Sequence, residues 1–583
     1  MSQKKTNSKS QRPAKPVQAR NVSYFDYQDV KKKYRNVARI AAGLLLCLFL
    51  VSVFKNISYP LFWADESMTA IGSERVLQYG YPKVHDGKNV FYDLRHSDPL
   101  LGINEKDDAY VGGTGWAHYF NGIIGYKLAE KTDDLYTKTG IYRATFAVEG
   151  ILGLCLLIFF ISKLLADSFS RYAFIAGFLL IELLSVSLAL LLREVRYYSL
   201  VILLTSLILG LYTTYRFHRP FNKILLVSIL SISLWILYNA FAPVYFIMIA
   251  AIGLSELTVA IFQYRKSTFK DAFLTVVPVL LATLLSIVAV FPLLSYFKTF
   301  EISAAMNVFN GYTTKMYWDN VSTVFTYFTK FELLWLAITL KLLVLLNVRD
   351  YLKSGSSLFK ASCFLSLYFL VYVFAIAKIP NFIYTRYIIY LQPVLAVIIM
   401  LDVASLLKSY AQHSKTFISI KMMGVLFLVT GFYLFTAIRN YENISGHITE
   451  LTHPYKGPLD YTIPYLKEKY PASDTLVIAA NYEETSYMYY LKSKVIIGYT
   501  GNNLKEDTLV QPDVIAYRKT WGNYSGIFQK FITNAPYDPV KFPVKDSPVN
   551  TIPELNFRPA FNHPFETRLT EDEKEATYLY IRK

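Results

Sequence analysis

Long, uninterrupted apolar runs constrain the fold of this chain more than any other feature of its sequence. Eleven such runs are present, each near the length that a tilted helix needs to cross a hydrocarbon layer of about 30 Å. Their approximate limits are 40–54, 142–163, 171–192, 197–215, 222–238, 241–262, 271–297, 331–348, 359–378, 386–407 and 421–438. The sequence therefore predicts an α-helical polytopic membrane protein with about 11 transmembrane helices.

The charges between these runs predict the orientation of the protein. The chain has 60 Lys and Arg against 43 Asp and Glu, and its formal net charge is +17. The basic residues gather in alternate short links such as YRFHRPFNK and QYRKSTFK, as the positive-inside tendency requires. We therefore predict an integral membrane protein with a cytoplasmic N-terminus, and we expect no nucleic-acid partner.

The rest of the chain divides around the apolar runs. Residues 1–39 are rich in Lys, Arg, Ser and Gln and have too few apolar residues to bury a core, so a disordered basic cytoplasmic tail is expected. Residues 40–440 form the predicted transmembrane domain, with a large outer loop at 57–141. Residues 441–583 contain no membrane-spanning run and are predicted to form an extracytoplasmic α/β domain.

Three short segments support the α/β prediction for the C-terminal region. DTLVIAA (474–480) and KVIIGY (494–499) are strand-like, and YEETSYMYYL (482–491) between them is compatible with a helix. The final segment, ATYLYIRK, is typical of a closing strand.

Charged residues at the outer membrane edge are the candidates for function. Asp65 and Glu66 follow the first apolar run directly, in the stretch FWADES. Such a pair is also typical of a solvated helix start, because acids favour the first turn. Arg193, Arg196 and Arg386 fall on the same side in the predicted topology, against the positive-inside tendency. Each of these arginines is either a phosphate ligand or an anchor whose side chain extends to the membrane interface. For Arg193, an ion pair with Glu194 is a further alternative.

Several short motifs lie in a characteristic order along the chain. They are Asp65-Glu66, Gly80-Tyr81-Pro82, Tyr142-Arg143, Arg193-Glu194-Val195-Arg196-Tyr197-Tyr198, and Arg386-Tyr387 with Pro393. Over about residues 40–440 the chain resembles the polytopic glycosyltransferases of the C superfamily, in the branch of protein O-mannosyltransferases and lipid A aminoarabinose transferases. It departs from many of these relatives at 112–120, where GGTGWAHYF replaces a Pro-Pro-aromatic stretch.

The resemblance implies a transferase that moves a sugar from a polyprenyl-phosphate donor to a hydroxyl acceptor on the extracytoplasmic side, with inversion. The acceptor class stays open between glycan, lipid and protein. Because phosphate is already a good leaving group, such an enzyme needs one base and some cations. Asp65 is the expected base, and Glu66 is either a catalytic partner or the support of a neighbouring helix or cation.

Other residues are assigned to the substrates on the same basis. The expected ligands of the donor phosphate are Arg386, Arg196, Arg193 and Lys83, and the expected contacts to sugar or acceptor are Asp107, Asp108 and Tyr387. Arg143 is expected to pair with a nearby acid. No metal site is predicted from a compact cluster, although a divalent cation stays open if Asp65, Glu66, Asp107 and Asp108 meet in space.

Three acids inside predicted spans favour a different class, a multi-span transporter of a lipid-linked or small polar substrate. Glu149, Glu182 and Glu256 lie where ionisable groups usually mark function or internal pairing. Buried, hydrogen-bonded acids are the simpler interpretation, because the sequence around them shows no clearly broken helix. A third class, a receptor or an assembly scaffold, would not explain the arginines at the outer edge.

Overall fold

The computed structural model describes residues 27–90, 102–104, 106–112, 115–218, 222–309, 311–379, 383–412, 420–497, 509–519, 525–547 and 566–583. Residues 1–26 of the expected tail lie outside this part. Residues 27–39, assigned to the same tail from the sequence, form the first turns of helix α1 (Tyr27–Phe54).

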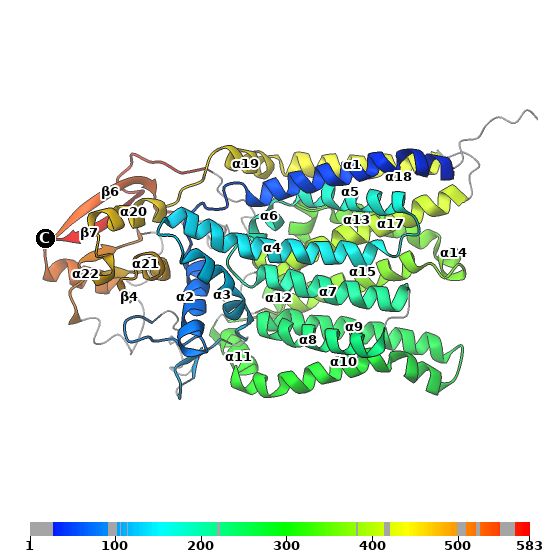
Figure 1. Cartoon of the computed structure of the whole chain (residues 1–583), viewed down its shortest axis with the longest axis horizontal. Helices are drawn as coiled ribbons and strands as arrows, with labels where there is room; N and C mark the ends of the chain where they lie inside the picture. The colour runs from blue at the N-terminus through cyan, green and yellow to red at the C-terminus, as the bar shows by residue number, and fades with distance from the viewer. Residues whose placement is uncertain are drawn as a thin grey trace, which may run out of the picture.

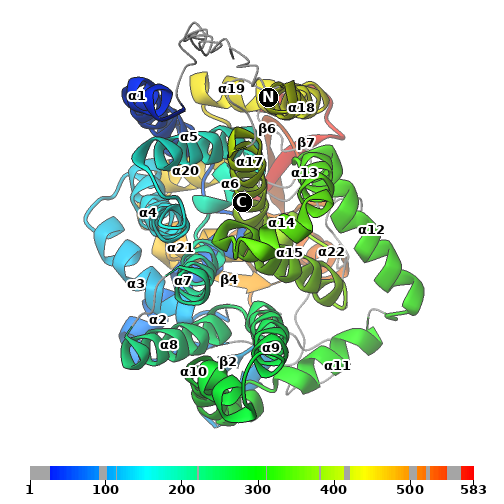
Figure 2. The same cartoon turned by 90° about the vertical axis from the view of Figure 1, so that its right-hand side faces the viewer.

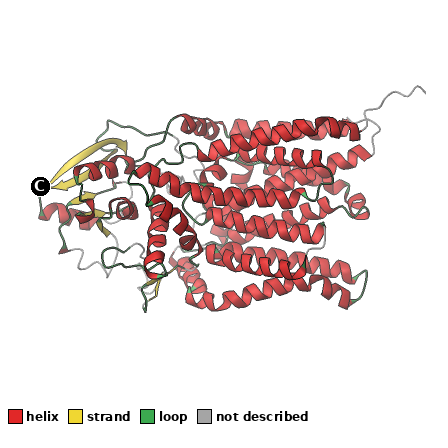
Figure 3. Ribbon diagram, in the orientation of Figure 1, coloured by secondary structure: helices red, strands yellow, loops and turns green. Residues whose placement is uncertain are grey.

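A bundle of long apolar helices makes up most of the protein, and a small sheet domain covers one end of it (Figures 1 and 3). Among the described residues, nine helices are long and apolar enough to cross a membrane. They are α1, α4 (Leu135–Ser162), α7 (Tyr198–Phe217), α8 (Lys223–Ala240), α9 (Ala242–Tyr264), α10 (Phe269–Tyr296), α15 (Ser357–Ile376), α17 (Gln392–Gln412) with α16 (Thr385–Ile388) and η1 (Ile389–Leu391) before it, and α18 (Ile420–Arg439). The predicted class of helical polytopic membrane protein is confirmed.

The helices of the bundle differ in how deeply they are buried. The end-on view shows α17 near the middle and α1 and α18 at the edge (Figure 2). In agreement, α17 is almost entirely buried, whereas most of the apolar stretch in α1 and in α18 is exposed for contact with lipid. The centre of the bundle therefore lies around the helix that directly follows Arg386.

Two of the eleven predicted spans differ in the structure. The run at 171–192 is divided into α5 (Ser168–Leu184) and α6 (Val186–Leu192), which are bent by 88° relative to each other. Ser185 leaves the helical conformation at the break, and its hydroxyl donates to Glu332 Oε1 at 2.6 Å. The run at 331–348 contains α13 (Leu334–Leu346), whose 13 residues extend only about 20 Å and fall short of the hydrocarbon thickness.

Shorter elements connect the bundle to the sheet domain and flank its sides. They are α2 (Ala64–Tyr79), α3 (Ala117–Ala129), α11 (Thr299–Phe309), α12 (Thr314–Lys330), α14 (Val348–Lys353), α19 (Tyr441–Thr452) and the two-stranded sheet of β1 (Gly102–Asn104) and β2 (Ala109–Val111). Helices α2 and α3 lie between the bundle and the sheet domain (Figure 1). We call this end of the bundle the domain end, and the opposite one the far end.

The sheet domain has five strands in the order β4-β3-β5-β7-β6. Its elements are α20 (Leu459–Lys469), η2 (Ser473–Thr475), β3 (Val477–Ala480), α21 (Glu484–Leu491), β4 (Lys494–Ile497), β5 (Val514–Ala516), α22 (Ser525–Asn534), β6 (Tyr537–Lys545) and β7 (Ala576–Arg582). Strand β3 is parallel to both β4 and β5, and β7 is antiparallel to β5 and β6. The strand, helix, strand and closing strand expected from the sequence are β3, α21, β4 and β7; residues 498–499 of the second expected strand lie outside the described part.

The sheet domain is hydrogen-bonded to the segment that leads into α2. Phe62 donates its backbone N–H to the hydroxyl of Tyr490 at 3.0 Å and accepts from Ser486 Oγ at 2.7 Å. The buried carboxylate of Asp460 accepts the backbone N–H of Leu61 at 3.1 Å, and desolvation raises the pKa of this carboxyl to about 6. Because Asp65 lies only a few residues further on, the domain fixes the position of the candidate base.

Candidate functional site

Asp65 and Glu66 both lie in the first turn of α2, where the positive end of the helix dipole favours acids. Their surroundings differ, since the side chain of Asp65 is 26% exposed and that of Glu66 is fully buried. Only Asp65 is therefore accessible to a substrate.

Two arginines from distant parts of the chain converge on Asp65. Arg386 Nη1 lies 3.3 Å from Asp65 Oδ2, and Arg196 Nη2 lies 3.5 Å from the same oxygen. Arg196 also donates from Nη1 to the backbone carbonyl of Asp65 at 3.4 Å and to Thr69 Oγ1 at 3.3 Å. With one carboxylate between two guanidinium groups, the cluster keeps a formal charge of +1, which an anionic ligand can use.

Aromatic rings hold the two guanidinium groups in place. Arg386 lies 4.4 Å from the ring centroid of Tyr384 and 5.5 Å from that of Tyr387, and Arg196 lies 5.6 Å from that of Tyr197. Tyr387 in turn stacks on Phe241 with the ring centroids 5.9 Å apart. The structure thus brings Tyr387, a predicted sugar or acceptor contact, next to the arginines.

Some residues around this cluster were missed by the sequence reasoning. Thr69 lies one helical turn after Asp65, a spacing that places both on one face and offers a usable signal. Tyr197 adjoins Arg196 inside a motif already singled out. Tyr384 and Tyr119 had no comparable signal, because Tyr is abundant in the chain and interfacial tyrosines are common.

Glu66 is engaged in a buried ion pair with Arg143 of α4. Arg143 donates from Nε to Glu66 Oε1 at 2.8 Å and from Nη2 to Glu66 Oε2 at 2.6 Å, and Val195 adds its backbone N–H at 3.1 Å. Arg143 also donates to the carbonyl of Pro60 at 2.7 Å. Both oxygens of Glu66 are therefore occupied, and the residue joins α2, α4 and the link before α7, which is the supporting role that the sequence offered beside a catalytic one. The expected pairing of Arg143 with an acid is observed.

Replacing Glu66 with Gln is expected to lower the free energy of unfolding by about 3–5 kcal/mol, because it leaves the buried guanidinium of Arg143 without its charged partner. Thermal unfolding in detergent measures the loss. Glu74→Gln on the same helix is the matched control, because the pair of Glu74 with Lys492 is partly exposed and is expected to contribute less than about 1 kcal/mol. Equal losses in the two variants would contradict this role of Glu66.

Arg193 was predicted to bind the donor phosphate or to pair with Glu194, and the structure gives it another partner. Its Nη2 forms a buried ion pair with Glu450 of α19, and its Nη1 donates to the carbonyl of Lys55 at 3.4 Å. His447 adds its ring nitrogen at 3.2 Å from the second oxygen of Glu450. Arg193 therefore connects α6 to α19 and to the end of α1.

Lys83, Asp107 and Asp108 lie together beyond the opposite end of α2, a helix of 16 residues and thus about 24 Å long. Tyr81 donates its hydroxyl to the carbonyl of Asp107 at 2.8 Å, and Asp108 accepts the backbone N–H of His85 at 2.7 Å. Asp108 has a φ of +58° in the turn between β1 and β2. The structure therefore does not bring these three predicted residues to the arginine cluster.

The carboxylates that might have shared a divalent cation are thus separated. Asp65 faces two arginines, Glu66 faces Arg143, and the pair at 107–108 belongs to the β1–β2 turn. In the part of the chain that the structure describes, no group of three or more His, Cys, Asp or Glu side chains has the geometry for a metal ion.

An apolar cavity of about 630 Å³ lies beside the arginine cluster, between α3, α7, α8 and α10. Its lining includes Trp116, Phe120, Leu200, Trp235, Ile236 and Phe297. Helix α7 begins directly after Arg196 and Tyr197 and contributes Leu200 one turn later, so cavity and cluster share a wall. Phe120 and Trp235 are 48% and 42% exposed, and the cavity therefore opens towards the side of the bundle.

The three acids inside the spans have polar neighbours. Glu149 accepts from Asn121 Nδ2 at 2.8 Å, and Glu256 accepts from the hydroxyl of Tyr212 at 2.6 Å and from Arg216. Glu182 lies next to Gln392 and Glu332, three residues before the 88° break. The expectation of unbroken helices around these acids is therefore wrong for Glu182. Three residues further on, Ser185 leaves the helical conformation and its hydroxyl donates to Glu332.

No protein-family model matches the sequence, and no curated protein matches it. The fold is similar to the crystal structure of ArnT from Cupriavidus metallidurans bound to undecaprenyl phosphate, with 12% identity, a TM-score of 0.42 and coverage of 81% of this chain and 87% of that one. It is also similar to the apo oligosaccharyltransferase of Archaeoglobus fulgidus, with 11% identity, a TM-score of 0.46 and coverage of 88% and 70%. Neither likeness decides the activity of this protein, which depends on its own residues.

Proposed function

We propose that the protein is a membrane glycosyltransferase that moves a sugar from a polyprenyl-phosphate donor to a hydroxyl acceptor, with inversion. The observation that carries the proposal is the placement of one accessible carboxylate, Asp65, within 3.5 Å of two guanidinium groups. A phosphate leaving group needs cations, and an attacking hydroxyl needs a base. The motif resemblance supplies the donor class.

The ion pairs of Asp65 describe the site before the donor binds. A donor phosphate entering between Arg196 and Arg386 competes with the carboxylate for the same guanidinium groups, and Arg386 offers two parallel N–H donors to phosphate oxygens. The released Asp65 then accepts the proton of the acceptor hydroxyl as this attacks the anomeric carbon. The same arginines offset the negative charge that grows on the departing polyprenyl phosphate.

The 630 Å³ cavity is proposed to hold the first isoprene units of the donor. It is apolar, shares a wall with the arginine cluster and opens sideways, which is what a lipid chain leaving the site for the bilayer requires. A contact of Asp107 with the sugar or acceptor stays part of the proposal.

Narrowing the cavity is expected to weaken donor binding without changing the chemistry. Ile236→Trp should raise the KM for the donor at least several-fold, since it displaces part of the isoprene chain, and should leave kcat within about twofold. Ile232→Trp, one turn earlier on α8 and 57% exposed, is the matched control and should behave as wild type. If Ile236→Trp leaves the KM for the donor unchanged, the isoprene chain of the donor does not bind in this cavity.

The domain end is proposed to face the extracytoplasmic side of a bacterial inner membrane. The links at the far end carry the basic residues, and the long segments and the sheet domain gather at the domain end. This orientation puts Asp65 where a translocated lipid-linked sugar is available. Glycan, lipid and protein hydroxyls all fit the chemistry of the acceptor.

The experiment that tests the proposal supplies purified protein with a sugar-loaded polyprenyl phosphate and a panel of hydroxyl acceptors, and measures free polyprenyl phosphate. We expect its release together with a glycosylated acceptor of inverted anomeric configuration. No release from a panel that covers envelope sugars and all three acceptor classes would contradict the proposal.

A transporter is the second candidate, and one observation favours it. The span at 168–192 is broken by 88° beside the buried Glu182 and Glu332, and broken helices next to buried acids occur at substrate sites of transporters. Sealed proteoliposomes separate the candidates: a transporter moves intact sugar lipid across the bilayer, whereas the proposed enzyme cleaves it.

A further inference from the structure

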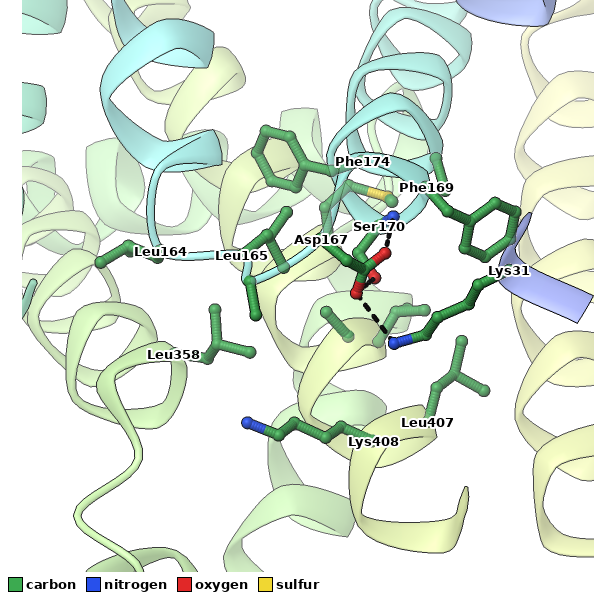
Figure 4. Close-up of a pocket in the computed structure, with 15 residues that line it drawn as sticks. Lys31, Leu164, Leu165, Asp167, Phe169, Ser170, Phe174, Leu358, Leu407 and Lys408 are labelled. Atoms are coloured by element: carbon green, nitrogen blue, oxygen red, sulfur yellow. Dashed lines mark hydrogen bonds and ion pairs between the residues drawn. The ribbon is translucent and has the colours of Figure 1, made fainter. Parts of the chain in front are cut away.

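A second cavity, of about 340 Å³, lies at the far end of the bundle, whereas α2 with Asp65 lies at the domain end (Figure 1). Figure 4 shows the residues that line it. It is formed by the first turns of α1, the link between α4 and α5, the start of α15 and the last turns of α17. No step of the proposed sugar transfer uses it.

The lining of this cavity is amphipathic. Its walls are apolar and include Leu164, Leu165, Phe169, Phe174, Leu358 and Leu407. Three charged side chains also line it, namely Lys31, Asp167 and Lys408 (Figure 4). An apolar pocket whose lining includes two amines suits a ligand that is both anionic and apolar.

The charges of the pocket favour an anion. Asp167 is already engaged: it pairs with Lys31 at 2.8 Å, and it caps α5 by accepting from Ser170 N and Ser170 Oγ at 2.9 Å each. Lys408 is exposed and extends beneath Leu358 (Figure 4). The formal charges of Lys31, Asp167 and Lys408 sum to +1. Lys163 and Arg171, on either side of Asp167 in the chain, add to the positive potential.

We propose that this cavity binds an acidic phospholipid from the surrounding leaflet, with its phosphate at Lys408 and Lys31 and an acyl chain along the apolar walls. Basic pockets between transmembrane helices are suited to such headgroups. The volume exceeds by far what a lone phosphate ion needs, since one water occupies about 30 Å³ in the liquid. The N-terminal residues 1–26 fit poorly as the occupant, because they carry six Lys or Arg against one Asp.

The position of the pocket gives the lipid a structural consequence. Lys31 lies near the start of α1, whose other end leads to Asp65, and Lys408 lies near the end of α17, which follows Arg386. A phosphate between these two lysines links the far ends of both helices. Binding is therefore expected to raise the thermal stability of the protein, whether or not it transfers sugar.

The test uses the purified full-length protein in phosphatidylcholine nanodiscs that contain a small fraction of phosphatidylglycerol with the same acyl chains. Native mass spectrometry counts the lipids that stay bound after release from the disc. We expect preferential retention of phosphatidylglycerol by the wild type and a loss of about fivefold in Lys408→Gln, the effect of one lysine on an acidic lipid. Ala404→Phe, which fills the cavity and keeps both lysines, should reduce retention similarly.

Lys360→Gln is the matched control, because Lys360 is an exposed lysine at the same end of α15 that does not line the cavity. It should retain phosphatidylglycerol as the wild type does, which also makes Lys408→Gln decisive if Ala404→Phe does not fold. Equal retention in Lys408→Gln and Lys360→Gln would overturn the proposal, as would equal retention of the two phospholipids by the wild type. If millimolar inorganic phosphate stabilises the protein as phosphatidylglycerol does, the pocket is a site for free phosphate and the lipid assignment is wrong.

Discussion

Asp65→Asn is expected to slow sugar transfer by about a hundredfold or more, because it removes the base and keeps the size of the side chain. The structure adds a second expectation for this variant. In the proposed mechanism Asp65, which pairs with Arg196 and Arg386, competes with the donor phosphate for them, and Asn would compete only weakly. Donor affinity should therefore stay unchanged or increase while kcat falls. Transfer rates and binding of polyprenyl phosphate, measured on the same preparation, check both parts.

Thermal unfolding is measured alongside, because a loss of activity through unfolding would appear as a lowered melting temperature. Glu74→Gln, an acid on the same helix that pairs with Lys492, is the activity control and should transfer sugar at the wild-type rate. If folded Asp65→Asn also transfers at that rate, Asp65 is not the base. A loss of donor affinity without a loss of kcat would instead make it a binding residue.

Arg386 is expected to be the most sensitive cation of the site. Arg386→Ala should nearly abolish transfer, because removing one charged donor from a site of this kind costs about a hundredfold to a thousandfold. Arg386→Lys keeps the charge but loses the bidentate fork and the stacking between Tyr384 and Tyr387, so it should bind the donor more weakly and transfer at an intermediate rate.

Arg439→Ala is the matched control for Arg386. Arg439 is an exposed arginine that ends α18 at the domain end and lies 5.5 Å from the ring of Phe435, as an interfacial anchor does. Its replacement should leave transfer and donor affinity unchanged. Wild-type kinetics in both Arg386 variants would make Arg386 an anchor as well and would remove the main support for a phosphate site.

The convergence of Asp65, Arg196 and Arg386 followed from topology read in the sequence. Alternating sides along the apolar runs placed all three at one end of the bundle, and outward-facing arginines stood out against the positive-inside tendency. Their geometry at 3.3 and 3.5 Å depends on packing that hydropathy does not encode.

Other pairings had no counterpart in the sequence pattern. Arg193 and Glu450 are 257 residues apart, and the sequence offered Glu194 as the obvious partner. The break after α5 lies inside a run that is apolar enough to predict one continuous span, and at this break Ser185 bonds to Glu332, 147 residues away. Tertiary contacts of this range override both hydropathy and local helix propensity.

The sheet domain shows the same division between local and non-local information. The spacing of apolar residues and the presence of β-branched residues were enough to predict β3, β4 and β7 near their observed positions. The order of the strands was not predictable from these signals, since β7, the last segment of the chain, lies between β5 and β6. The place of β7 depends on its pairing with β5 and β6, which is a contact between segments distant in the sequence.

The central claim is that the arginines paired with Asp65 in the free protein are those that bind the donor's phosphate. It is tested most directly by an experimental structure of the protein with a polyprenyl phosphate bound. We expect that the phosphate lies within hydrogen-bond distance of Arg196 and Arg386, that Asp65 has left at least one of them, and that the isoprene chain enters the cavity lined by Ile236. A phosphate bound elsewhere, with both ion pairs of Asp65 intact, would contradict it.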